Sequence, residues 1–174
     1  KINQAITVFG NPSSLHSIGF EAEKLKENAR ESIYKALGVK KMSGDKIIFT
    51  SGGTEANNMA VFGCVKSKPN NKCKKIITTD SEHLSVLTPF RMLENEGYEV
   101  VYLPTTSGKI NLDDIKKHVD SNTVFISVMA VNNETGAMYD IQNIFKLAKS
   151  INPNITTHTD MVQGFMKIPF SPNK

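Results

Sequence analysis

The sequence predicts an α/β fold in which one parallel or mixed sheet carries helices on both faces. Strand-like and helix-like segments alternate along the chain without internal repeats, which is typical of layered α/β domains. The segment 124–131 is almost entirely apolar and rich in β-branched residues, as expected of a central strand covered on both faces. Polar residues gather where the expected strands end, and such sheets bind their ligands there.

The individual elements follow from periodicity and from residues that start or end helices. Residues 20–37 carry apolar side chains at helical spacing, and Gly38 is the expected end of that helix. Asn111 is expected to cap a short helix, and Asp140 to open a later one. Residues 1–19 show no periodicity and predict a loop or arm. Further strands are expected from residue 47 and at 76–79, 98–104 and 155–160, further helices from residues 54 and 80, and a loop at 67–75.

Length and composition favour an ordinary globular protein. The 174 residues can bury one sizeable core, and they suggest an arm at 1–19 followed by a domain at 20–174. No apolar run approaches the roughly 20 residues that cross a bilayer, and no leader pattern opens the sequence, so a cytoplasmic protein is expected. Cys64 and Cys73 have neither metal-site nor disulfide spacing. The net charge of +4 comes from scattered lysines without interleaved aromatics, which predicts no nucleic-acid partner.

The segment 47–58, IIFTSGGTEANN, has the layout of an anion site. Gly52 and Gly53 have no Cβ to block a ligand, and the first amides of the following helix offer free N–H groups. Ser51 and Thr54 add hydroxyl groups, so a phosphate would fit. The segment lacks the Lys-Ser/Thr pair of a P-loop and the G-x-G-x-x-G spacing of a dinucleotide site. An ordinary capped helix would also explain the pattern.

Three other strand ends would offer polar groups to the same crevice: His83, residues 132–134 and residues 158–163. A phosphate cup, an imidazole, an amide and a carboxylate together suit pyridoxal phosphate (PLP) better than other common cofactors. His83 can stack on the pyridine ring, and Asp160 can pair with the ring nitrogen. Gln163 can hydrogen-bond the phenolic oxygen.

Five segments carry a family resemblance, in family order and over almost the whole chain: GNPSSLH (10–16), FTSGGTEANN (49–58), EH (82–83), VNNETG (131–136) and HTDMVQ (158–163). The chain resembles class V aminotransferase-fold enzymes, which are PLP enzymes of fold type I, and within them the NifS-like and IscS-like cysteine desulfurases. The resemblance implies that 20–174 form part of a large domain with a mixed, mostly parallel sheet. It also implies a role in iron–sulfur cluster assembly or tRNA thiolation.

The resemblance also assigns roles to particular residues. It implies that Gly53 and Thr54 bind the phosphate and that His83 is the catalytic histidine above the ring. It implies the ring contacts of Asp160 and Gln163 described above, and a contact from Asn133 to the phenolic oxygen or the substrate carboxylate. The implied substrate-binding residues are Asn11, Ser13, Asn133 and Arg30. Arg30 would approach the active site of a partner subunit, which implies a homodimer.

Two groups of the complete enzyme have no counterpart in this sequence. Lys167 and Lys174 do not match the lysine that holds the cofactor covalently, and Cys64 and Cys73 do not match the cysteine that receives sulfur as a persulfide. A fragment that is inactive alone is therefore expected. The complete enzyme would convert L-cysteine to L-alanine and pass the sulfur to an acceptor or scaffold protein.

Four alternatives remain open from the sequence. His83, His158 and Asp160 could be hydrogen-bonded structural residues. Glu82, His83, His158 and Asp160 could belong to a metal hydrolase. The chain could be an inert α/β scaffold that binds no cofactor. Other class V enzymes, namely aminotransferases and selenocysteine lyases, would share the same cofactor residues.

Overall fold

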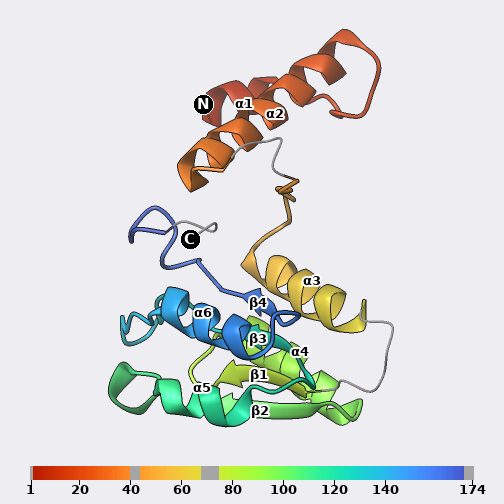
Figure 1. Ribbon diagram of the computed structural model, residues 1–174. Coiled ribbons are helices and arrows are strands. Elements are labelled where there is room, and N and C mark those ends of the chain that lie inside the picture. Colours follow the sequence, from red (N-terminus) through yellow and green to blue (C-terminus); the bar gives the residue numbers. More distant parts are fainter. Residues whose placement is uncertain (1, 40–43, 68–74, 171–174) are drawn as a thin grey trace. The chain divides into compact units, whose positions relative to one another are not determined.

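The computed structural model describes residues 2–39, 44–67 and 75–170, which divide into two compact units. The first unit holds residues 1–49 and 169–174, and the second holds residues 50–168. Figure 1 shows the elements of each unit. The loop expected at 67–75 lies almost entirely outside the described residues. None of the described helices has the length and apolar character needed to cross a membrane.

The first unit contains helices α1 (Ile2–Thr7) and α2 (Ser17–Leu37). The ring nitrogen Nδ1 of His16 accepts a hydrogen bond from the amide of Gly19 at 3.1 Å and thereby caps the start of α2. Gly38 ends α2 in the left-handed conformation with φ of 67°, as predicted. The buried Tyr34 donates its hydroxyl to the carbonyl of Asp45 at 2.8 Å, which ties the helix to the following segment.

Two predictions for secondary structure near the N-terminus are wrong. Residues 1–19 do not form only a loop, because they include α1 and the first three residues of α2. A histidine cap is outside the usual Ser, Thr, Asp and Asn set, so no recognisable start signal precedes residue 17. The strand expected from residue 47 is also missing among the described residues 44–52. Arg30 donates to the carbonyl of Ile47, which therefore bonds a side chain instead of a neighbouring strand.

The second unit is a parallel α/β structure. Its strands lie in the order β2-β1-β3-β4, and all three neighbouring pairs are parallel. Its elements are α3 (Gly53–Lys66), β1 (Lys75–Thr79), α4 (Leu84–Asn95), β2 (Glu99–Leu103), the short 3-10 helix η2 (Thr106–Gly108), α5 (Leu112–His118), β3 (Thr123–Ser127), α6 (Ile141–Ile151) and β4 (Thr156–His158). The predicted α/β fold class is confirmed, and so are the predicted caps Asn111 and Asp140.

The chain first moves from β1 toward one edge of the sheet and then toward the other edge. The crossover through α4 leads from β1 to β2, whereas the crossover through α5 returns past β1 to β3. Because such crossovers are right-handed, α4 must cover one face of the sheet, and α5 and α6 the other (Figure 1). The carboxyl ends of β1 and β3 therefore border a topological switch point, where open α/β sheets bind ligands.

Both faces of the two central strands are buried. Ile76 of β1 and Phe125 of β3 pack with Val61 of α3 and Phe90 of α4 in one apolar cluster. The next residue in each strand points to the opposite face, and it is also apolar and fully buried, at Ile77 and Ile126. This double burial explains the apolar run at 124–131 that predicted a central strand, and the apolar start of the strand predicted at 76–79.

The chain beyond β3 stays beside the chain beyond β4. β3 ends at Ser127, four residues earlier than predicted, yet the amide of Val128 donates to the carbonyl of His158 at 3.1 Å. The amide of Ala130 donates in turn to the carbonyl of Asp160 at 3.0 Å. Residues 128–131 and 158–160 thus run together past the sheet edge and build one side of the pocket described next.

Candidate functional site

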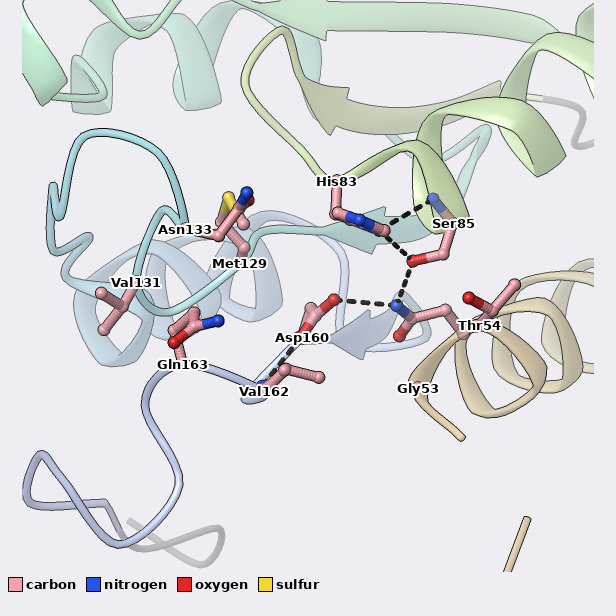
Figure 2. Close-up of a pocket in the computed structure, with 11 residues that line it drawn as sticks. Gly53, Thr54, His83, Ser85, Met129, Val131, Asn133, Asp160, Val162 and Gln163 are labelled. Atoms are coloured by element: carbon pink, nitrogen blue, oxygen red, sulfur yellow. Dashed lines mark hydrogen bonds between the residues drawn. The ribbon is translucent and has the colours of Figure 1, made fainter. Parts of the chain in front are cut away.

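A cavity of about 290 Å³ opens at the carboxyl ends of β1, β3 and β4, next to the start of α3 (Figure 2). All of its residues belong to the second unit. The lining residues are Gly53, Thr54, Asn57, His83, Ser85, Met129, Val131, Asn133, Asp160, Val162 and Gln163. The pocket therefore brings together all six residues predicted to bind the cofactor: Gly53, Thr54, His83, Asn133, Asp160 and Gln163.

The start of α3 offers backbone donors to this pocket. The first backbone bond of the helix runs from the amide of Ala56 to the carbonyl of Gly52, so the amides before it have no partner within the helix. Glu55 accepts hydrogen bonds from the amide and hydroxyl of Ser51, both at 2.6 Å, and these bonds lower the pKa of its carboxyl. A Cβ added at Gly53 would lie 3.2 Å from a methyl group of Val162, so a larger residue here would press on that side chain of the pocket wall.

His83 is held in place by the start of α4, which it caps. Its Nδ1 atom accepts a hydrogen bond from the amide of Ser85 at 3.1 Å and lies 2.8 Å from the Ser85 hydroxyl. The imidazole forms part of the pocket wall (Figure 2). The turn from β1 into α4 therefore fixes the ring at the switch point.

Asp160 is buried at the base of the pocket, with 8% of its surface exposed. One carboxylate oxygen accepts from the amide of Val162, and the other accepts from the side-chain amide of Asn57, both at 2.8 Å. The same Asn57 nitrogen also donates to the Ser85 hydroxyl at 2.8 Å. These contacts join Asp160 to His83 through two side chains that come from α3 and α4.

The remaining two predicted cofactor residues belong to loops after β3 and β4. Asn132 shapes the first loop, because its side-chain oxygen accepts from the amides of Glu134 and Thr135 at 3.0 and 2.8 Å. Its neighbour Asn133 lines the pocket. In the second loop, the Gln163 oxygen accepts from the ammonium of Lys167 at 3.2 Å. The Gln163 amide nitrogen is then the end of the side chain that can donate to a ligand oxygen.

Glu82 lies beneath the pocket and joins the ends of β1 and β3. One of its oxygens accepts from the amide of Met129 at 2.6 Å and from the hydroxyl of Thr79 at 3.2 Å. Its other oxygen is buried without a hydrogen-bond partner among the described residues. Burial raises the pKa of this carboxyl from 4.5 to about 7, and the charge of Asp160 adds to the increase.

His158 faces the sheet instead of the pocket. Its Nδ1 atom lies 2.8 Å from the Ser127 hydroxyl, and its ring stacks on Phe125 with centroids 5.8 Å apart. Burial lowers the pKa of the imidazole from 6.5 to about 4. Within the described ranges, no three His, Cys, Asp or Glu side chains are grouped as a metal site would require. The metal-hydrolase alternative therefore receives no support from the geometry.

Asn11, Ser13 and Arg30, which the sequence predicts to bind substrate, belong to the first unit. The side-chain oxygen of Asn11 accepts from the amide of Ser13 at 2.9 Å, within a turn before α2. The guanidinium of Arg30 pairs with Glu27 at 3.1 Å and lies over the ring of Phe49, 4.9 Å from its centroid. The roles of these three residues stay predictions.

Sequence reasoning missed five of the lining residues: Asn57, Ser85, Met129, Val131 and Val162. Helical spacing could have indicated Asn57, because it lies three positions after Thr54 and so shares its helix face. Ser85 lies two residues after the cap His83, in the first turn of α4, where its side chain is close to the His83 ring. Nothing in the local sequence distinguishes the three apolar residues from ordinary core positions.

Comparison with known proteins agrees with this fold. The family model described as aminotransferase class V matches residues 2–174, and the chain belongs to this family. Among its relatives, the cysteine desulfurase IscS of Dictyoglomus turgidum is 48% identical over 92% of this chain, and that of Rickettsia prowazekii is 45% identical over 97%. In each case, the chain spans 40% of the relative's length.

Solved structures show the same likeness. A NifS-like protein superposes with a TM-score of 0.91 and 35% identity, and the match covers 99% of this chain and 48% of that one. A structure described as SspA in complex with cysteine gives a TM-score of 0.81 and 34% identity, over 91% of this chain and 44% of that one.

Proposed function

We propose that this chain is part of a PLP-dependent cysteine desulfurase, which converts L-cysteine to L-alanine and transfers the sulfur to a cysteine of the enzyme. The observation that carries the proposal is the convergence of three strand ends and one helix start on a single pocket. The names of the relatives at 45–48% identity support the choice of reaction within the family.

The pocket chemistry fits PLP. The helix start at Gly53 and Thr54 would hold the phosphate, since its first amides have no partner within the helix and Gly53 places no side chain beside them. The buried carboxylate of Asp160 would pair with the ring nitrogen. When bound, PLP draws electrons away from the substrate carbon that carries the amino group.

The other pocket residues would orient the ring and the substrate. His83 would cover one face of the ring, because the start of α4 fixes its imidazole in the pocket wall. Gln163 would donate its amide to the phenolic oxygen, and Asn133 would contact that oxygen or the substrate carboxylate. Met129 and Val131 supply an apolar surface that excludes water from the site.

The partners proposed with this function are a second copy of the chain and a protein that accepts the sulfur. Arg30 would approach the active site of the second copy, and Asn11 and Ser13 would line the substrate entrance. A role in iron–sulfur cluster assembly agrees with the names of the IscS relatives. The cytoplasmic location stays a prediction, because the relatives include a desulfurase of Candida albicans that is named mitochondrial.

Product analysis with the full protein that carries this chain tests the proposal. Loaded with PLP and given L-cysteine and a thiol reductant, it should release alanine and sulfide in equal amounts. Asp160→Asn should lower the rate roughly a hundredfold or more, because it removes the charge from the ring-nitrogen partner. The matched control Asp114→Asn changes a carboxylate of α5, outside the pocket, and should leave the rate unchanged. A PLP-loaded protein that releases no alanine from cysteine would refute the proposed reaction.

A further inference from the structure

Four polar side chains form an unbroken hydrogen-bonded row across the base of the pocket. The row runs from Asp160 through Asn57 and Ser85 to His83, and each of its three links measures 2.8 Å. Figure 2 draws these links as dashed lines and labels Asp160, Ser85 and His83. Asn57 and Ser85 are buried, with 5% and 7% of their surfaces exposed, so water does not compete strongly for these bonds. The direction of each bond can be derived from the donors and acceptors available.

The Asn57 amide must point its nitrogen toward Asp160. An ionised carboxylate only accepts hydrogen bonds, and the Asp160 oxygen concerned lies 2.8 Å from the amide. The amide nitrogen carries two hydrogens, and the two short contacts use both of them, one to Asp160 and one to the Ser85 hydroxyl. The Ser85 oxygen is therefore an acceptor toward Asn57.

The Ser85 hydroxyl has a single hydrogen, and Asn57 does not need it. This hydrogen is directed to the other close neighbour of the hydroxyl, the Nδ1 atom of His83. The backbone amide of Ser85 donates to the same Nδ1 atom at 3.1 Å. A ring nitrogen that accepts from two donors carries no hydrogen of its own, so the proton of the neutral imidazole must lie on Nε2.

We propose that Asn57 and Ser85 are positioning residues that fix His83 as the tautomer protonated on Nε2. Each hydrogen bond then determines the direction of the next one. The Asp160 carboxylate orients the Asn57 amide, Asn57 orients the Ser85 hydroxyl, and Ser85 determines which ring nitrogen of His83 carries the proton. The Nε2 hydrogen is left for water or a bound molecule. Its use toward a PLP ring or its substrate rests on the proposed function, whereas the tautomer itself does not.

Nuclear magnetic resonance on the PLP-free form of the full protein that carries this chain tests this proposal directly. In protein labelled with ¹⁵N at its histidines, long-range ¹H–¹⁵N spectra distinguish a protonated ring nitrogen from an unprotonated one. His83→Gln identifies the His83 signals by their loss. At a pH where the ring is neutral, we expect a protonated Nε2 and an unprotonated, hydrogen-bonded Nδ1. A His83 signal with the proton on Nδ1 would overturn the proposal.

Substitutions at Ser85 test whether its hydroxyl donates to Nδ1 of His83, as the hydrogen-bonded row requires. Ser85→Ala leaves only the backbone donor at Nδ1, so the Nδ1 resonance should shift toward that of a free acceptor nitrogen. Ser85→Thr keeps the hydroxyl and should restore the original resonance. Ser81→Ala removes a nearby hydroxyl that pairs with Tyr139 instead, and should leave the His83 signals unchanged. An unchanged Nδ1 resonance in folded Ser85→Ala would refute the role of the hydroxyl.

Substitution of Asn57 separates this proposal from the proposed function. Asn57→Leu frees the Ser85 hydroxyl to rotate, so we expect the His83 Nδ1 resonance to move in the PLP-free full protein. An unmoved resonance in the folded variant would show that Asn57 does not orient Ser85. Failure of the protein to bind PLP would refute the cofactor assignment, yet it would not alter the tautomer measured without PLP.

Discussion

At the scale of single residues, two buried titratable groups lie just behind the pocket and have pKa values shifted in opposite directions. Burial raises the pKa of the Glu82 carboxyl to about 7 and lowers that of the His158 imidazole to about 4. In both cases burial disfavours the charged form, so both groups are neutral over an overlapping pH range. Their effects on the pH dependence of stability have opposite signs.

The sign for each group follows from proton linkage. The folded state binds the Glu82 proton more tightly than the unfolded state, so this stabilisation is complete below pH 4.5 and is lost as the pH rises through about 7. The unfolded state binds the His158 proton more tightly, so that stabilisation is present above pH 6.5 and is lost as the pH falls through about 4. Between about pH 4.5 and 6.5, the two contributions oppose each other.

Single substitutions should therefore expose a pH dependence that the wild-type protein conceals. Relative to wild type, Glu82→Gln should become more stable as the pH rises from 5 to 7.5, by about 2–3 kcal/mol. His158→Asn should show the reverse, gaining relative stability of similar size as the pH falls. Urea unfolding at the two pH values measures both effects.

Glu134→Gln is the control for this experiment, because it neutralises an exposed carboxylate in the same unit. It should follow the wild-type stability at both pH values. If Glu82→Gln and His158→Asn did the same, the opposed shifts assigned to these residues would be wrong.

The sequence could predict the pocket residues that have a chemically distinctive type or belong to a motif, such as His83 and Asp160. It could not predict that Asn57 joins them. That role depends on how α3 packs beside α4 and on the path of the chain after β4, and local sequence determines neither. Glu82 also precedes His83 directly, yet only the fold shows that it points beneath the pocket.

At the scale of elements, α4 contains a proline whose missing hydrogen bond is replaced from α3. Pro89 has no N–H to donate to the carbonyl of Ser85, four residues earlier. The side-chain amide of Asn58 on α3 donates to that carbonyl at 3.4 Å. Pro89 therefore leaves the Ser85 carbonyl without a backbone donor, and a side chain of the neighbouring helix α3 donates to it instead.

A double-mutant cycle tests this exchange. Asn58→Ala should destabilise the wild-type protein, and the part due to the Ser85 carbonyl should be roughly 0.5–1 kcal/mol. In a Pro89→Ala background, the restored backbone N–H satisfies that carbonyl, so Asn58→Ala should cost less by that amount. The urea midpoints of the four proteins give the coupling energy. A coupling near zero would show that Asn58 does not compensate for the proline.

Element boundaries were predictable where a residue of known preference marks them. Gly38, Asn111 and Asp140 end or cap helices as expected. The prediction failed at Ser17, where a histidine ring provides the cap, and near Ile47, where Arg30 takes the carbonyl that a strand would pair. In both places, a side-chain contact overrides the local pattern.

At the scale of the whole molecule, almost all of the buried apolar side chains belong to the second unit. Among the described residues, Tyr34 is the one buried apolar side chain of the first unit, whereas the sheet of the second unit is covered on both faces. The switch point that creates the pocket is also formed within the second unit, by β1 and β3. The sequence could predict this convergence because alternating strands and helices restrict the topology strongly.

The distribution of the core predicts that residues 50–168 fold without the rest of the chain. A protein limited to these residues should unfold cooperatively in urea, with a midpoint close to that of the 174-residue chain. Its ¹H–¹⁵N spectrum should keep dispersed signals for the residues around the pocket. A gradual transition without a clear midpoint would show that the first unit supplies essential stability.

The central claim, that the pocket at the switch point holds PLP, is tested most directly by equilibrium dialysis of the full protein that carries this chain. Gly53→Val adds a side chain to the pocket wall beside Val162, whereas Gly63→Val changes a glycine of the same helix where a Cβ would meet nothing within 4 Å. Wild type and Gly63→Val should retain PLP, and folded Gly53→Val should retain at most about a tenth as much, a loss of about 1.4 kcal/mol or more in binding. Equal retention by Gly53→Val and wild type would contradict the account.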